Sequence, residues 1–171
     1  MQTLASMVGV HMRAHLHDWR MQAASYVAFP CAALGLQNTT KDNLRVHDVQ
    51  GQDGLVQAWD MLIKRCDAAL VLVDHSAPDP LQDLDYHLEQ LRLRRPDGMP
   101  IVVGVTRLCA QRPLTIYNRH LGRTRCACSH CRPPVFEFDS RSTGDVRITF
   151  STLLALVEME QRFDAVRCRA G

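Results

Sequence analysis

The chain has 171 residues, of which 46% are hydrophobic and 22% charged, and its formal net charge is +2. This length suits a single domain, spanning residues 1–171, with a sizeable core. The near-neutral balance provides no broad positive field, so we expect no nucleic acid partner. The longest apolar runs are too short to cross a bilayer. Seven cysteines without a secretory signal sequence favour a reduced, cytoplasmic location.

The first 43 residues give weak signals for secondary structure. Thr3–Val10 is predicted as a short strand, His11–Met21 as a helix and Tyr26–Leu36 as a second strand, with a turn over Asn38–Asn43. Leu44–Asp48 alternates between apolar and polar residues, which is typical of a strand with one buried face.

The remainder of the chain alternates between helical and strand patterns. Leu55, Trp59, Leu62 and Cys66 form one helical stripe, and Ala68–Asp74 reads as a strand buried on both faces. Such alternation predicts a parallel α/β sheet with right-handed crossovers. The later elements are a helix after Asp79 with Pro80 at its first position, ended by Pro96-Asp97-Gly98, a strand over Pro100–Thr106, a helix near Pro113–Leu121, a strand over Pro134–Phe138 and a final helix from Ser142–Asp145.

A short motif follows the Leu44–Asp48 strand. It reads Asp48-Val49-Gln50-Gly51-Gln52, and a stripe of apolar residues at helical spacing comes after it. No G-x-x-x-x-G-K-[ST] phosphate loop occurs in the sequence.

From Leu44 to about Val157 the chain resembles the Ras-like small GTPase superfamily. More closely, it resembles a bacterial branch of predicted ATP/GTP-binding proteins related to the GTPases of gliding motility. The segments that carry the resemblance are DVQGQD, LVLVDHSAPDPLQDLDYHL, IVVGVTRL and PPVFEFDSRSTGDV. The resemblance implies a Ras-like, P-loop NTPase-type three-layer sandwich with a mostly parallel sheet and an eroded N-terminal region. We expect Thr3–Val10 to fill the central sheet position of the missing first strand.

The resemblance also implies roles for residues that would contact GTP or GDP. Asp48 would hold Mg²⁺ through water, Gly51 would meet the γ-phosphate, and Gln52 would position the attacking water. Ser25 could add a hydroxyl ligand to the magnesium ion.

Three further residues match the parts of the family that surround the guanine base. Thr106 and Arg107 match the base-recognition motif, and Ser140 matches a final motif that uses backbone N–H groups. At Cys109 the family has an aspartate, and a thiol cannot accept the paired hydrogen bonds from guanine.

Loss of the phosphate loop removes the backbone donors and the lysine that hold phosphates, which should remove most of the catalytic rate. The favoured function is therefore a degenerate small GTPase, a pseudo-GTPase, that binds protein partners through the face around Gln52–Lys64. By family analogy the partner is of the roadblock type, in polarity or motility signalling. The alternative is a working GTP hydrolase with a rebuilt phosphate site, in which Arg13 or Arg20 replaces the lysine.

A second cluster of candidate ligands lies near the C-terminal third of the chain. Cys126, Cys128 and Cys131, with His130 between the last two, offer the soft ligands that zinc prefers. Adjacent His130 and Cys131 would be strained as joint ligands. This cluster therefore predicts either a zinc site, and with it a zinc-stabilised interaction module, or a surface loop with incidental thiols.

Overall fold

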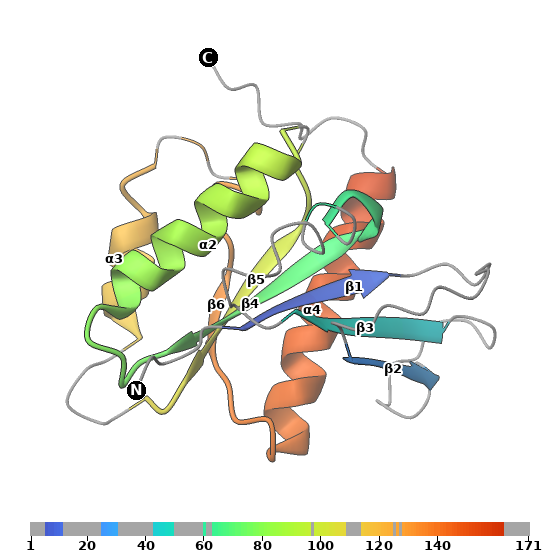
Figure 1. Ribbon diagram of the computed structural model, residues 1–171, viewed down its shortest axis with the longest axis horizontal. Coiled ribbons are helices and arrows are strands. Elements are labelled where there is room, and N and C mark those ends of the chain that lie inside the picture. Colours follow the sequence, from blue (N-terminus) through green and yellow to red (C-terminus); the bar gives the residue numbers. More distant parts are fainter. Residues whose placement is uncertain are drawn as a thin grey trace.

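A computed structural model describes residues 6–11, 25–30, 43–49, 60, 63–96, 98–108, 114–124, 126 and 128–162. These residues form one six-stranded sheet with helices on both faces (Figure 1). The strands are β1 (Ser6–His11), β2 (Ser25–Pro30), β3 (Asn43–Val49), β4 (Ala68–Asp74), β5 (Ile101–Thr106) and β6 (Val135–Glu137). The helices are α2 (Pro80–Arg94), α3 (Thr115–Leu121) and α4 (Thr143–Arg162).

The strand order in the sheet is β2-β3-β1-β4-β5-β6. The half formed by β4, β5 and β6 is parallel, which confirms the parallel arrangement predicted for those strands. The predicted strand near residues 3–10 lies between β3 and β4, the central position that we expected it to fill.

The direction of β1 differs from the mostly parallel sheet that we predicted. β1 is antiparallel to both of its neighbours, and β2 is antiparallel to β3 (Figure 1). The parallel pairings are therefore confined to β4, β5 and β6. Apolar alternation along a strand reports its buried face and not its direction, so this part of the prediction was wrong.

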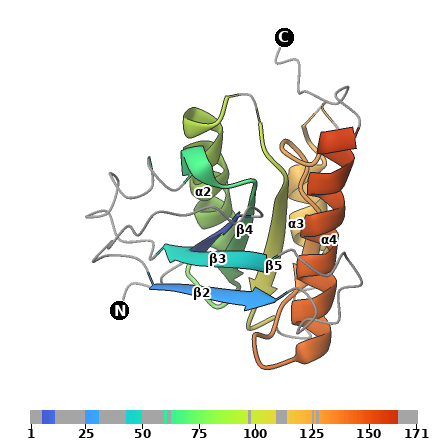
Figure 2. The ribbon, with the colours of Figure 1, turned by 90° about the vertical axis from the view of Figure 1, so that its right-hand side faces the viewer.

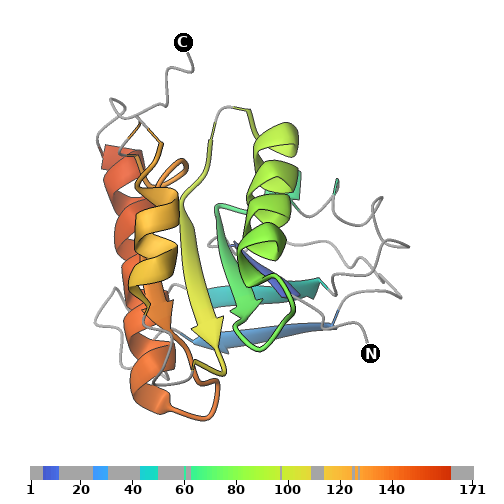
Figure 3. The same cartoon turned by 90° about the vertical axis from the view of Figure 1, so that its left-hand side faces the viewer.

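The core lies in two layers, one on each face of the sheet. On one face, α2 and α3 cover Val71, Val73, Val103 and Val105. On the other face, α4 covers alternate residues of the same strands, such as Leu70. Figures 2 and 3 show α2 and α4 on opposite sides of the sheet. Strands covered on both faces need continuous apolar runs, which the sequences of β4 and β5 supply.

Helix α2 begins and ends at the signals that its sequence carries. The Asp79 carboxylate accepts a hydrogen bond of 3.0 Å from the Gln82 backbone N–H, and Pro80 occupies the first helical position. The helix ends at Arg94, and Gly98 then adopts a φ of 82°, which favours glycine. Leu84, Leu88 and Leu91, which are spaced at helical intervals, are buried.

The predicted helix before β4 is described only in part. Ile63 to Arg65 are helical, and Ile63 and Cys66 are buried. Apart from Asp60, which is also helical, the earlier residues of that helix lie outside the described part, as do residues 12–21 of the predicted helix over 11–21 and residues 38–42 of the predicted turn. The Arg95 guanidinium donates to the carbonyls of Ile63 and Cys66, at 3.2 and 3.0 Å, and so joins this segment to the end of α2.

Candidate functional site

The carboxyl ends of β4 and β5 meet at one edge of the sheet. Asp74 ends β4 and lies directly opposite Thr106, which ends β5. The His75 N–H donates to the Thr106 carbonyl at 3.0 Å, so the hydrogen bonding between the two segments continues one residue beyond β4. Ligands of open α/β sheets bind at this kind of edge.

Asp74 organises the turn that leaves β4. Its side chain is buried, and one carboxylate oxygen accepts hydrogen bonds from the Ser76 N–H and hydroxyl, at 2.9 and 2.6 Å. The other oxygen accepts from the Arg107 guanidinium at 2.8 Å. Both oxygens of this carboxylate therefore accept hydrogen bonds from within the protein.

Thr106 and Arg107, the two residues expected to contact the base, lie beside Asp74. The Thr106 hydroxyl donates inward to the Val73 carbonyl at 3.2 Å. Arg107 has a φ of 53°, which is unusual for a residue with a side chain, and its guanidinium spans from Asp74 to Ser76. Both side chains thus make hydrogen bonds within the protein at this edge of the sheet.

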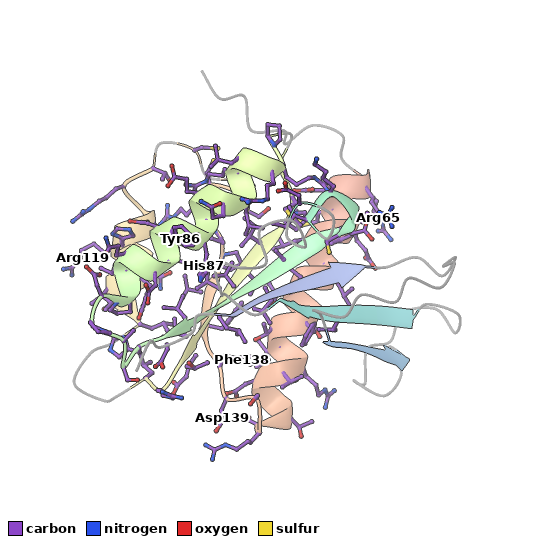
Figure 4. The ribbon with its side chains drawn as sticks, in the orientation of Figure 1. Arg65, Tyr86, His87, Arg119, Phe138 and Asp139 are labelled. Atoms are coloured by element: carbon purple, nitrogen blue, oxygen red, sulfur yellow. The ribbon has the colours of Figure 1, made fainter. Side chains whose placement is uncertain are left out.

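Ser140 is exposed in the turn between β6 and α4. Its neighbour Asp139 accepts hydrogen bonds from the Arg141 side chain through both carboxylate oxygens, which lowers the pKa of Asp139 to about 2. The Asp139 N–H donates to Asp145, and Ser142 exchanges hydrogen bonds with Asp145 at the start of α4. Figure 4 shows Asp139 near this end of the helix. The turn is therefore built around a helix cap.

A buried contact between a histidine and a tyrosine lies at the same edge and was not predicted. His75 Nδ1 lies 2.7 Å from the Tyr117 hydroxyl of α3. Its Nε2 atom is buried and has no hydrogen-bond partner among the residues that the structure describes. The Asp-His-Ser sequence that follows an apolar strand signals the turn, but nothing in the sequence indicates that Tyr117 completes the contact.

The magnesium and catalytic residues of the expected GTPase motif are described only at Asp48. Asp48 is the second-last residue of β3, and the sheet register places it opposite Val8 of β1 and Ser25 of β2. Gly51 and Gln52 lie outside the described residues, and so does Cys109. The structure therefore does not place the expected water-positioning glutamine.

The three predicted zinc ligands are brought together between α3 and β6. The Sγ atoms of Cys126, Cys128 and Cys131 all lie within 4.8 Å of one another, and three thiols so close could hold a metal such as zinc. No disulfide joins any two of these three cysteines. Cys128 is buried, which raises the pKa of its thiol.

His130 lies in the same loop and is not one of this group. Its Nδ1 atom lies 3.5 Å from the Met99 backbone N, and a Cβ atom added at Gly98 would lie 3.5 Å from its ring. Burial, and to a smaller degree the Arg92 charge, lower the pKa of His130. The imidazole is therefore neutral near pH 7 and faces the turn that enters β5.

The chain matches no known protein-family model, and no curated protein is significantly similar to it in sequence. Within the part of the chain that the structure describes, no helix combines the length and apolar character needed to cross a bilayer.

Proposed function

We propose that the protein is a degenerate small GTPase, a pseudo-GTPase that acts as a protein-binding regulatory module. The observation that carries this proposal is the direction of β1. A phosphate cradle in an α/β sheet is a loop that leaves a central strand at the carboxyl edge of its parallel neighbours and enters a helix there. Here the central strand runs the other way.

The register of β1 against β4 shows at which edge of the sheet the chain leaves β1. Ser6, the first residue of β1, lies opposite Leu72 near the carboxyl end of β4, whereas Val10 lies opposite Ala68 at its amino end. The chain that follows β1 therefore starts from the edge opposite Asp74 and Thr106. With no phosphate-loop motif in the sequence, this geometry favours loss of tight phosphate binding.

Contacts at the carboxyl edge support the same proposal. The Asp74 carboxylate, the Ser76 hydroxyl and the Arg107 guanidinium bond to one another. A ligand that used the Arg107 Nη1 donor would compete with the buried Asp74 carboxylate for a charge-assisted hydrogen bond.

The partner surface proposed is the face around residues 52–64, with a roadblock-type regulator as the partner. Within its described part, Lys64 is exposed, and Asp60 is held by an ion pair of 2.6 Å with Arg94 of α2. An acidic group held in an ion pair and an exposed basic group give the described part of this face a polar character. Bacterial polarity or motility signalling, in the cytoplasm, is the family-level setting for this proposal.

A working GTP hydrolase is the second candidate, and one observation favours it. Ser25 lies directly opposite Asp48 on the neighbouring strand, so the register brings together the two residues that would ligate Mg²⁺. In that case Gln52 would position water, and Thr106, Arg107 and Ser140 would frame the base.

Nucleotide titration separates the two candidates. The purified chain is titrated with fluorescent GTP, GDP and ATP analogues, with and without Mg²⁺. The pseudo-GTPase predicts no binding up to millimolar nucleotide. Magnesium-dependent guanine binding at micromolar or lower concentration, abolished in Asp48→Ala but kept in the surface control Asp85→Ala, would establish the second candidate instead.

Partner binding is tested separately with a purified roadblock-type protein by calorimetry. Lys64→Glu reverses an exposed charge on the proposed face and should weaken binding about tenfold or more. Arg123→Glu makes the same reversal on an exposed residue after α3 and should leave binding unchanged. Equal effects of the two variants would remove the support for this face.

A further inference from the structure

The loop between α3 and β6 carries three thiols that the proposed function does not use. We infer that Cys126, Cys128 and Cys131 bind one Zn²⁺ ion through three thiolates, and that water fills the fourth position. This site is independent of the nucleotide edge and goes beyond the proposed pseudo-GTPase function.

The distances between the sulfur atoms fit a single zinc ion. Zinc thiolate bonds are about 2.3 Å long, so two thiolates of a tetrahedral site lie about 3.8 Å apart. Here the Sγ atoms of Cys126 and Cys128 are 3.2 Å apart, and the separations in the whole group do not exceed 4.8 Å. Shifts of less than about 1 Å would therefore bring each sulfur to a tetrahedral position.

A disulfide does not account for this geometry. A sulfur–sulfur bond is about 2.05 Å long, and the 3.2 Å between Cys126 and Cys128 is well beyond that. A disulfide would also leave the third thiol of the group unused. Zinc uses all three thiols at once, since it prefers soft thiolate ligands and carries no redox chemistry of its own.

The backbone around the thiols forms a turn that holds them in place. The N–H groups of Cys131 and Arg132 both donate to the Cys128 carbonyl, at 3.1 and 2.8 Å. The Arg92 side chain of α2 donates to the Cys131 carbonyl at 3.3 Å, which anchors the loop to the neighbouring helix. Three thiolates and Zn²⁺ leave a net charge of −1, and the Arg92 guanidinium supplies a nearby positive charge.

The fourth position is not taken by His130. Its Nδ1 atom faces the Met99 N–H, and its ring packs against Gly98. The metal-ligand group found among the described residues contains the three cysteines alone. Because no fourth protein ligand joins the group among the described residues, we assign the fourth position to water, which gives the open tetrahedral arrangement of three protein ligands and one water.

The site explains how a loop without regular structure keeps its shape. Between Leu121 and Val135 the described residues form neither helix nor strand. A zinc ion would tie residues 126 and 131 to the buried Cys128 and so fix the path from α3 into β6. Metal removal should therefore loosen this loop first.

Metal analysis of the full chain, purified without a histidine tag and under reducing conditions, tests the site. We expect one zinc per chain by mass spectrometry. After exchange, Co²⁺ should give a thiolate-to-cobalt charge-transfer band in the near ultraviolet. Both signals should fall to background in Cys128→Ser and in Cys131→Ser.

Two variants keep the test interpretable. Cys66→Ala removes a thiol that is buried outside the group, and it should retain one zinc per chain. Cys126→Ser changes a half-buried ligand and serves if a Cys128 variant fails to fold. Wild-type protein with no stoichiometric zinc and no cobalt band, or a band that persists without Cys128 and Cys126, would overturn the inference. Neither the zinc content nor the cobalt band depends on nucleotide binding, so the zinc site and the proposed function are tested separately.

Discussion

At the scale of single residues, Gly104 shows how closely the sheet and its neighbours fit. It lies in the middle of β5, and a Cβ atom there would come within 2.8 Å of the Leu72 side chain and 3.0 Å of the Phe138 Cβ. The first contact can yield by rotation of the Leu72 side chain. The second cannot, because it involves a Cβ atom that is fixed to the backbone.

Gly104→Ala is therefore expected to destabilise the protein by about 1–3 kcal/mol through overpacking. Urea unfolding followed by circular dichroism measures the change in unfolding free energy. Gly144→Ala is the matched control, since its new Cβ in the first turn of α4 would meet only the Ser142 hydroxyl, at 3.7 Å. That control should be neutral or stabilising by up to about 1 kcal/mol. A Gly104→Ala protein as stable as the control would show that β5 is packed less tightly.

The residues of the candidate nucleotide site also show what a sequence can and cannot predict. That Thr106 ends β5, and that Arg107 and Ser140 come after β5 and β6, was predicted correctly, because an apolar run followed by a polar residue marks a strand end. That Arg107 pairs with Asp74 was not predicted. The contact depends on the register of β4 against β5, and no local pattern encodes that register.

At the scale of elements, those defined by local chemistry were predicted well. The N-cap of α2 at Asp79 and the apolar runs of β4 and β5 each depend on a few consecutive residues. The direction of β1 depends instead on partners far along the chain, Val46 and Val49 on one side and Leu70 on the other. The cluster of Cys126, Cys128 and Cys131 falls between these cases, because the three residues are neighbours in sequence but the turn sets how they are oriented.

Helix α2 also carries a buried histidine that links its packing to pH. His87 is 4% exposed on the face of α2, and Figure 4 shows it next to Tyr86. Burial lowers the pKa of His87 below its ordinary 6.5, although the charge of Asp83 opposes this shift. The unfolded chain therefore binds a proton at a pH where the folded chain does not. The stability that comes from burying neutral His87 is present above pH 6.5 and is lost as the pH falls from there to the lowered pKa of His87.

We expect the unfolding free energy to decrease as the pH falls below 6.5, and His87→Gln to make that decrease smaller. Urea unfolding at half-unit steps from pH 7.5 to pH 5 measures both slopes. Leu93→Gln places the same amide on an exposed position of the same helix and should keep the wild-type slope. If His87→Gln and wild type lose stability in parallel, proton uptake at His87 does not contribute.

At the scale of the whole molecule, β1 joins the two halves of the sheet, because no strand of the β2-β3 half pairs directly with a strand of the β4-β5-β6 half. On one side it pairs with β3, which carries β2, and on the other with β4 of the parallel half. Pro30 ends β2 at the outer edge, where a missing N–H is tolerated. A central strand has no such tolerance, because its N–H groups are needed on both sides.

Hydrogen exchange and one proline substitution test this central position. In the intact protein the amides of residues 7–10 should exchange about as slowly as those of β4, since each is bonded within the sheet. Val8→Pro removes one donor, leaves a carbonyl of a neighbouring strand unpaired and should cost about 1–3 kcal/mol or more in urea unfolding. Ser25→Pro, at the first residue of the edge strand β2, should cost less. Rapid exchange of residues 7–10, with equal stability of the two proline variants, would mean that β1 is not a central strand. It would also remove the main observation in favour of a pseudo-GTPase, which is the direction of β1. A strand of the opposite direction at that position could lead into a phosphate-binding loop at the edge of Asp74 and Thr106.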